Sequence, residues 1–188
     1  MRKFTFIAKA GLCLLLLTTP SANAASSGEL RNFLTRFIGV WEGEFFIQKL
    51  DGEVLQKFPA RNTFTWEETP DKFELKGNAV FSIGDKMELS ESTTYLKDGQ
   101  VISEITQNDK TTVFSGTVDL EKLTVTWVPY DEDGIPGQKT IEKILYDEDG
   151  THILTSGFET VPVDDSLVTF AIKGSVRRLA FHPDNTDR

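Results

Sequence analysis

From residue 40 onward, apolar and polar positions of the chain alternate with a period of two. The alternating segments are rich in Val, Ile, Thr, Phe and Trp, the residue types that favour β-strands. We expect the second segment to bend or break at Pro59, because proline lacks an N–H group for the ladder. The pattern predicts ten strands, at residues 40–49, 54–68, 72–82, 86–96, 100–107, 111–118, 122–130, 138–147, 151–161 and 166–179.

One segment before these strands has a helical pattern. Residues 29–38 carry apolar side chains three and four positions apart, which places them on one stripe of a helix. Gly39 follows, as expected for a residue just beyond a helix end. The apolar positions are Leu30, Phe33, Leu34, Phe37 and Ile38.

The connections between the strands are short, and four of them contain Asp-Gly, beginning at Asp51, Asp98, Asp133 and Asp149. Asp-Gly between alternating segments indicates a β-hairpin, because the tight turn requires positive φ angles. Parallel crossovers need a dozen residues or more, so consecutive strands are expected to be antiparallel. A meander of ten strands hides its two edges by closing on itself. The sequence therefore predicts an all-β protein: a closed antiparallel meander β-barrel with one short N-terminal helix covering an end.

The first 24 residues have the pattern of a secretory signal peptide. Arg2 and Lys3 begin it, an apolar run over residues 7–17 follows, and Ala22 and Ala24 occupy the positions that signal peptidase reads. The apolar run is too short for a membrane anchor, which needs about 20 apolar residues. Cys13 lies inside this run and not at its end, so a lipoprotein site is not expected.

Cleavage after Ala24 would leave one domain, residues 25–180, and a flexible tail at 181–188. We therefore expect a protein secreted into the periplasm of a Gram-negative bacterium, with no membrane anchor after cleavage. The net charge of −9 argues against nucleic acid, which binds basic surfaces. The same charge argues against docking on anionic lipid.

The start of the predicted barrel carries a family resemblance. A short helix precedes Gly39-Val40-Trp41, and an arginine, Arg178, stands at the end of the last strand. This arrangement resembles the calycins, which include lipocalins, fatty-acid-binding proteins and nitrobindin-like barrels. The resemblance implies that an arginine packs on the tryptophan and closes the barrel bottom. In the last strand, Arg178 falls on the same alternating positions as the apolar residues, whereas Arg177 does not. Arg178 should therefore face inward, where the face of the Trp41 ring can accommodate a cation.

Alternation also predicts which side chains face the interior and contact a ligand. The interior could be solid, or it could be a cavity lined by aromatic rings with a few polar groups, which is typical of small-molecule sites. Mid-strand glycines, among them Gly77, Gly116 and Gly174, are expected either to bend strands or to leave empty volume. The candidate ligand-binding residues are Phe45, Phe64, Trp66, Phe81, Met87, Glu91, Tyr95, Trp127, Phe158 and Phe170.

Signals of catalysis or of a cofactor are sparse. The chain has two histidines, and His152 is a weak candidate for a haem ligand by analogy with nitrobindin-like barrels. For an enzyme on this frame, the candidate general base is Glu91, which interrupts a run of alternating apolar residues, or His152 at the barrel rim. The acidic turns at 131–134 and 147–150 do not fit an EF-hand loop, so no metal is expected.

The sequence thus favours a binding protein over an enzyme. We expect a small apolar or amphipathic molecule as the partner, and no cofactor. The alternatives are a haem-binding barrel, a filled barrel that works through its outer face, and an acid–base enzyme acting at the barrel mouth. The oligomeric state stays open.

Overall fold

The structure is a computed structural model that describes residues 25–69, 72–84, 86–130, 137–164 and 166–179. The predicted signal peptide, 1–24, and the predicted tail, 181–188, lie outside the described residues. Within the described part, no helix is both long enough and apolar enough to cross a membrane.

The predicted helix is present and begins two residues early. It consists of α1 (Ser27–Leu34) and a 3₁₀ turn, η1 (Thr35–Phe37). A capping box at Ser26 sets the start: the Ser26 hydroxyl accepts from the Glu29 N–H at 3.3 Å, and the Glu29 carboxylate accepts from the Ser26 N–H at 2.8 Å. The predicted start rested on the spacing of apolar residues, which takes no account of polar capping residues. The prediction therefore placed the helix start two residues too late.

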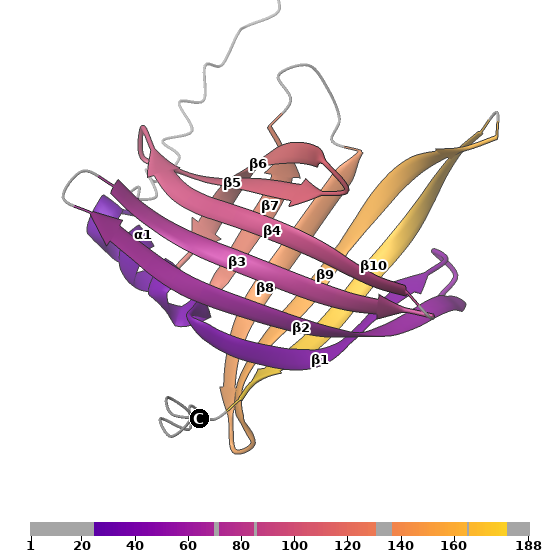
Figure 1. Cartoon of the computed structure of the whole chain (residues 1–188), viewed down its shortest axis with the longest axis horizontal. Coiled ribbons are helices and arrows are strands. Elements are labelled where there is room, and N and C mark those ends of the chain that lie inside the picture. Colours follow the sequence, from indigo (N-terminus) through magenta and orange to yellow (C-terminus); the bar gives the residue numbers. More distant parts are fainter. Residues whose placement is uncertain (1–24, 70–71, 85, 131–136, 165, 180–188) are drawn as a thin grey trace, which may run out of the picture.

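Ten antiparallel strands form one closed barrel, as predicted (Figure 1). Each strand pairs with its neighbours in the sequence, and β1 pairs with β10 to close the sheet. Closure leaves no free edge strand, which is the problem that a ten-strand meander has to solve. The strands are β1 (Gly39–Gln48), β2 (Val54–Thr69), β3 (Lys72–Ile83), β4 (Lys86–Lys97), β5 (Gln100–Gln107), β6 (Lys110–Asp119), β7 (Thr124–Pro129), β8 (Gln138–Asp147), β9 (Gly150–Val163) and β10 (Ser166–Arg178).

The strand β2 is not broken at Pro59, because its pairing with β1 continues through this residue. Pro59 pairs with Glu44 of β1, while the pairing of β2 with β3 begins only at Ala60. The missing N–H of Pro59 therefore lies where β2 has one neighbour, a position that proline tolerates.

Helix α1 covers one end of the barrel and completes a compact apolar layer there (Figure 1). We call this layer the floor and define it by Trp41, Val125, Ile144, Ile153 and Val176, which are 0–2% exposed. Leu30, Phe33 and Leu34 of α1 pack against it from outside. The floor thus buries large side chains where the helix meets the strand ends.

Arg178 and Trp41 close the floor in the predicted manner. The Arg178 guanidinium carbon lies 4.5 Å from the centroid of the Trp41 ring, a cation–π contact. The Nη2 group of the same guanidinium donates a hydrogen bond to the carbonyl oxygen of Arg36 in η1. The Trp41 indole N–H donates to the Phe37 carbonyl at 2.7 Å. These bonds tie the first strand, the last strand and the helix together.

At the opposite end, which we call the mouth, three hairpins extend beyond the strands beside them (Figure 1). The tip of each hairpin carries a large exposed apolar side chain. Leu50 lies in the β1–β2 connection, Met87 in β4 and Leu167 in β10, each at least 73% exposed. The two ends of the barrel therefore differ: one is covered by a helix and the other is open.

Candidate functional site

The pairing register identifies the side chains that face the barrel interior. Residues paired across antiparallel strands lie on the same face of the sheet. Starting from buried Trp41, the register places Asn62 of β2 and Ala79 of β3 on the inner face. Followed around the closed sheet, the same rule assigns every described strand position to one face.

Six of the ten candidate ligand-binding residues face the interior. Trp66 lies nearest the floor, where it packs against the buried core. The other five rings lie on five strands, β1, β2, β3, β7 and β10. The inward candidates are Phe45, Phe64, Trp66, Phe81, Trp127 and Phe170.

The three candidates on β4 point outward, so their predicted inward orientation is wrong. Met87 is 76% exposed, Glu91 is exposed, and Tyr95 pairs with outward Glu74. The parity rule failed because the outer side of the projecting hairpin is apolar, while the inner side of this strand is polar. The inward side chains of β4 are Glu88, Ser90, Ser92, Thr94 and Leu96.

Phe158 of β9 was also assigned to the wrong face. It pairs with Lys139 and Ala171, both on the outer side of the barrel. In the middle of β9 the inner side carries Thr155, Gly157 and Glu159, while the outer side carries Leu154 and Phe158, so hydrophobicity gave a false orientation. The inward side chains of this strand include Ile153, Thr155 and Glu159.

One wall of the interior is aromatic. Phe45, Phe58 and Phe81, from β1, β2 and β3, form a cluster whose ring centroids lie 5.8–6.1 Å apart. Phe45 and Phe58 are stacked, while Phe81 meets both edge-on. Such contacts add about 0.5–1.5 kcal/mol per pair beyond the buried area. The rings provide a preformed apolar surface on strands rather than on loops.

Three glycines are occupied by neighbouring rings, so they are not empty volume. A Cβ atom on Gly174 would lie 2.5 Å from the Phe45 ring, and one on Gly116 would lie 2.5 Å from the Trp127 ring. A Cβ atom on Gly77 would meet the Ser92 hydroxyl oxygen first and then the Phe64 ring, at 2.8 Å. In each case the glycine is the cross-strand partner of the aromatic residue. The rings therefore lie close against the wall, which keeps them out of the centre of the barrel.

The inner face of β4 and β5 carries polar groups. On β4 and β5 the Thr94 hydroxyl donates to the Ser103 hydroxyl at 2.9 Å. Closer to the mouth, the Gln107 amide donates to the Glu88 carboxylate at 2.8 Å. Hydroxyl and amide groups in an interior favour water or a polar ligand group over a dry core.

Glu142 is the most notable polar group of the interior, and the sequence reasoning missed it. It pairs with buried Val125 and Thr155, immediately above the floor. The Trp127 indole N–H donates to one Glu142 oxygen, Oε2, at 2.8 Å. Burial raises the pKa of Glu142, and the bond from Trp127 opposes this effect. Lys139 and Lys143 occupy the alternate positions of β8, and lysines rarely face an interior. Their spacing was the sequence signal that Glu142 faces inward.

Exposure shows that the interior is open toward the mouth. Along β8, Gln138 and Glu142 are partly exposed while Ile144 is buried, and along β10 Phe170 is partly exposed while Val176 is buried. A filled barrel would bury all of these inward side chains. A cavity of about 450 Å³ lies at the mouth. Its lining includes the inward side chains Ile105, Gln107, Thr112, Phe114, Gln138 and Glu159.

His152 and Glu91 both lie on the outer face of the barrel. Neither is therefore placed to serve a haem or an acid–base reaction in the interior. His152 pairs with outward Arg177, and its Nε2 atom lies 3.3 Å from an Asp147 oxygen. It therefore cannot ligate a haem inside the barrel. Glu91 is exposed on the outer face and cannot act on a molecule in the interior. Among the described residues, no group of three or more His, Cys, Asp or Glu could hold a metal ion.

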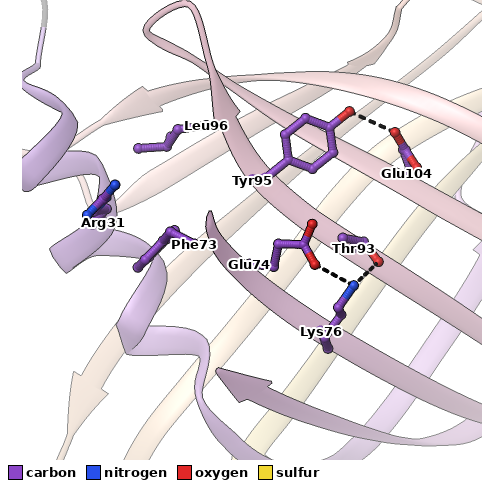
Figure 2. Close-up of a pocket in the computed structure, with 8 residues that line it drawn as sticks. All are labelled: Arg31, Phe73, Glu74, Lys76, Thr93, Tyr95, Leu96 and Glu104. Atoms are coloured by element: carbon purple, nitrogen blue, oxygen red, sulfur yellow. Dashed lines mark hydrogen bonds and ion pairs between the residues drawn. The ribbon is translucent and has the colours of Figure 1, made fainter. Parts of the chain in front are cut away.

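A second hollow, of about 490 Å³, lies at the outer face of β3–β5 beside α1 (Figure 2). Lys76 bonds Glu74 at 2.6 Å and Thr93 at 3.2 Å. Tyr95 donates to Glu104 at 2.7 Å, which together with burial raises the pKa of Tyr95 to about 12. These polar groups bind one another, which makes the outer hollow a weaker candidate than the interior. Arg31, Phe73 and Leu96 complete its lining.

The candidate site is therefore the open half of the barrel interior: an aromatic wall on β1–β3, polar groups on β4, β5, β8 and β9, and Glu142 with Trp127 at the bottom. Comparisons of the chain with family models, with curated proteins and with solved structures give no match.

Proposed function

We propose that this protein binds a small apolar or amphipathic molecule in the barrel interior. The observation that carries the proposal is the gradient of exposure along the inward side chains of β8 and β10, from a buried floor to a partly exposed upper interior. A preformed concave site with an apolar wall and a few polar groups is the usual composition of small-molecule sites. The mouth cavity of about 450 Å³ lies in the size range of such sites.

We also propose that the protein is calycin-like and that it acts outside the cytoplasm. The Trp41–Arg178 contact supports the calycin resemblance, because it is the closure that the family pattern implies. The signal-peptide pattern of residues 1–24 supports secretion, with the periplasm as the expected compartment.

Binding can be tested with a neutral apolar fluorophore, N-phenyl-1-naphthylamine, and a pair of variants that differ only in the face of β3. Ala79 faces the interior, whereas Val80 pairs with outward Arg61. We expect Ala79→Trp to lower the affinity for the probe at least about tenfold, because the indole occupies the interior. Val80→Trp should bind the probe as the wild type does.

Two outcomes would contradict the proposal. One is a folded wild-type protein that does not bind the probe. The other is binding that responds equally to Ala79→Trp and Val80→Trp, which would place the probe on the outer face. Native mass spectrometry of protein purified from its own host is an independent check, since a resident small molecule should be retained.

A further inference from the structure

The charged groups of the barrel interior are all of one sign between the hairpin ends and the floor. Within the described residues, the inward charged side chains in this region are Glu88, Glu142 and Glu159. Lys86 and Lys110 share the inward parity but stand exposed at the hairpin ends. Lys110 also lines the mouth cavity, so a molecule that enters the barrel passes this lysine first. Below it, among the described residues, the molecule meets carboxylates and no cation until it reaches the floor.

Arg178 does not compensate these carboxylates. Its guanidinium is part of the floor, where it lies over the Trp41 ring and donates to the Arg36 carbonyl. Glu88 accepts a hydrogen bond from the Gln107 amide near the mouth, and Glu142 accepts one from the Trp127 indole. Glu142 is the deepest of the three, about 13 Å along β8 from Gln138 at the mouth.

Glu142 and Trp127 together have the composition of a site for a cation. Among the described residues, the indole N–H of Trp127 is the one hydrogen-bond donor to the Glu142 carboxylate, and it bonds Oε2. The second oxygen, Oε1, is left for a ligand. The face of an indole attracts a cation through its quadrupole, by about 0.5–2 kcal/mol. Gly116 lets the Trp127 ring lie near the wall, so the ring and the carboxylate are held on adjacent strands.

The aromatic wall is connected to this pair through the sheet. The row of paired residues that starts at Glu142 passes through Thr155 and Gly174 and reaches Phe45, three strands away. Adjacent strands lie about 4.8 Å apart, so the carboxylate and the Phe45–Phe58–Phe81 cluster are separated by about 14 Å along the wall. A polar end and an apolar end of one small molecule can thus be bound at different places.

We infer that the barrel interior selects an amphipathic molecule whose polar end is a protonated amine, with the amine at Glu142 and Trp127 and the apolar part along the aromatic wall. This inference rests on the proposed function and specifies its ligand class. A carboxylate ligand is disfavoured, because it would bring a second negative charge beside Glu142 without a cation to compensate it. An uncharged amphiphile would bind through the rings alone.

The test compares three ligands of equal chain length at pH 7, decylamine, decanol and decanoate, by isothermal titration calorimetry on the mature protein. We expect decylamine to bind at least about tenfold more tightly than decanol, and decanoate to bind most weakly. In Glu142→Gln the preference for decylamine over decanol should vanish, while the decanol affinity stays within about twofold. Glu91→Gln is the matched control, because Glu91 is an exposed acid on the outer face, and it should keep the preference.

The outcomes separate this inference from the proposed function. If decanol binds as tightly as decylamine, or if Glu142→Gln keeps the amine preference, the inference is wrong and the proposed function stands. If none of the three ligands binds, both are wrong. Circular dichroism of each variant establishes that a lost preference does not come from unfolding.

Discussion

The floor and the mouth half of this barrel are built from the same strands and the same alternation, yet they differ in what the alternation buries. At the floor, Trp41 and Val125 are fully buried under helix α1. Two or more positions further along the same strands, Phe45 and Trp127 are only partly buried. The same inward direction therefore means a packed core at one end and an accessible surface at the other.

This difference suggests a division of labour within one sheet. The floor contributes stability, because fully buried side chains give the largest transfer free energy, about 1.5–3 kcal/mol each. The mouth half contributes less stability and keeps its rings available. A residue of the floor and a residue of the mouth should thus respond differently to truncation, in stability and in binding.

The largest effect is expected from Trp41→Ala. The change removes a fully buried ring, its bond to Phe37 and its contact with Arg178, so the free energy of unfolding should fall by about 3–5 kcal/mol. Phe170→Ala, in the mouth half, should cost about 1–2 kcal/mol because solvent already reaches this ring. Denaturant unfolding measures both, and Phe170→Ala should also weaken binding of the neutral probe. Equal losses of stability in the two variants would show that the two halves are packed alike.

The next effect concerns the glycines that accommodate the rings. Gly116→Ala places a Cβ atom 2.5 Å from the Trp127 ring, so the ring must move toward the interior. We expect a loss of about 1–3 kcal/mol in stability and weaker binding of the neutral probe. Gly28→Ala is the control, since the nearest atom to its Cβ is 4.0 Å away. A folded Gly116→Ala protein with unchanged stability and binding would show that Trp127 has free space behind it.

The same contrast explains which parts of the molecule were predictable from the sequence. The ten strands follow from local alternation and turn residues, which act over a few positions. The Trp41–Arg178 contact was expected from the calycin resemblance, and alternation in the last strand only selected Arg178 over Arg177. The facing of Phe45 and Phe170 followed as well, because those strands are apolar on the inner side. Met87 and Phe158 were misassigned because the rule that apolar residues face inward holds only for a dry interior.

Glu142 illustrates a second reason. Its orientation depends on the register of β8 with β7 and β9, and a carboxylate in an alternating segment is ordinarily read as solvent-facing. The lysines on the opposite parity, Lys139 and Lys143, carried the correct information. The identity of its donor, Trp127, depends on the sheet pairing and is not a property of the local sequence.

A smaller, pH-dependent effect should distinguish the interior from the floor. The pKa of Glu142 is raised in the folded state, so the ionised carboxylate costs stability above the ordinary glutamate pKa of about 4.3. Glu142→Gln should therefore be more stable than the wild type at pH 7. This difference should shrink as the pH falls toward 4, where both side chains are neutral. Unfolding measured between pH 4 and 8 provides the test, and parallel profiles for the two proteins would contradict it.

Trp127→Phe sharpens that comparison. It removes the N–H donor that opposes the rise of the Glu142 pKa, while it keeps an aromatic ring at the position. The loss of stability with rising pH should then be steeper than in the wild type.

The smallest effect is expected at the N-terminus of α1, the element that covers the floor. Ser26→Ala removes the hydroxyl that accepts from the Glu29 N–H, so the protein should lose about 0.5–2 kcal/mol of stability. Ser26→Asp should restore most of this loss, because aspartate caps helices equally well. The affinity for the neutral probe should change by less than about twofold in both variants, since the cap lies beyond the floor and not in the mouth half. A large loss of binding in Ser26→Ala, with stability almost unchanged, would mean that the helix controls the interior directly and that the two halves do not act separately.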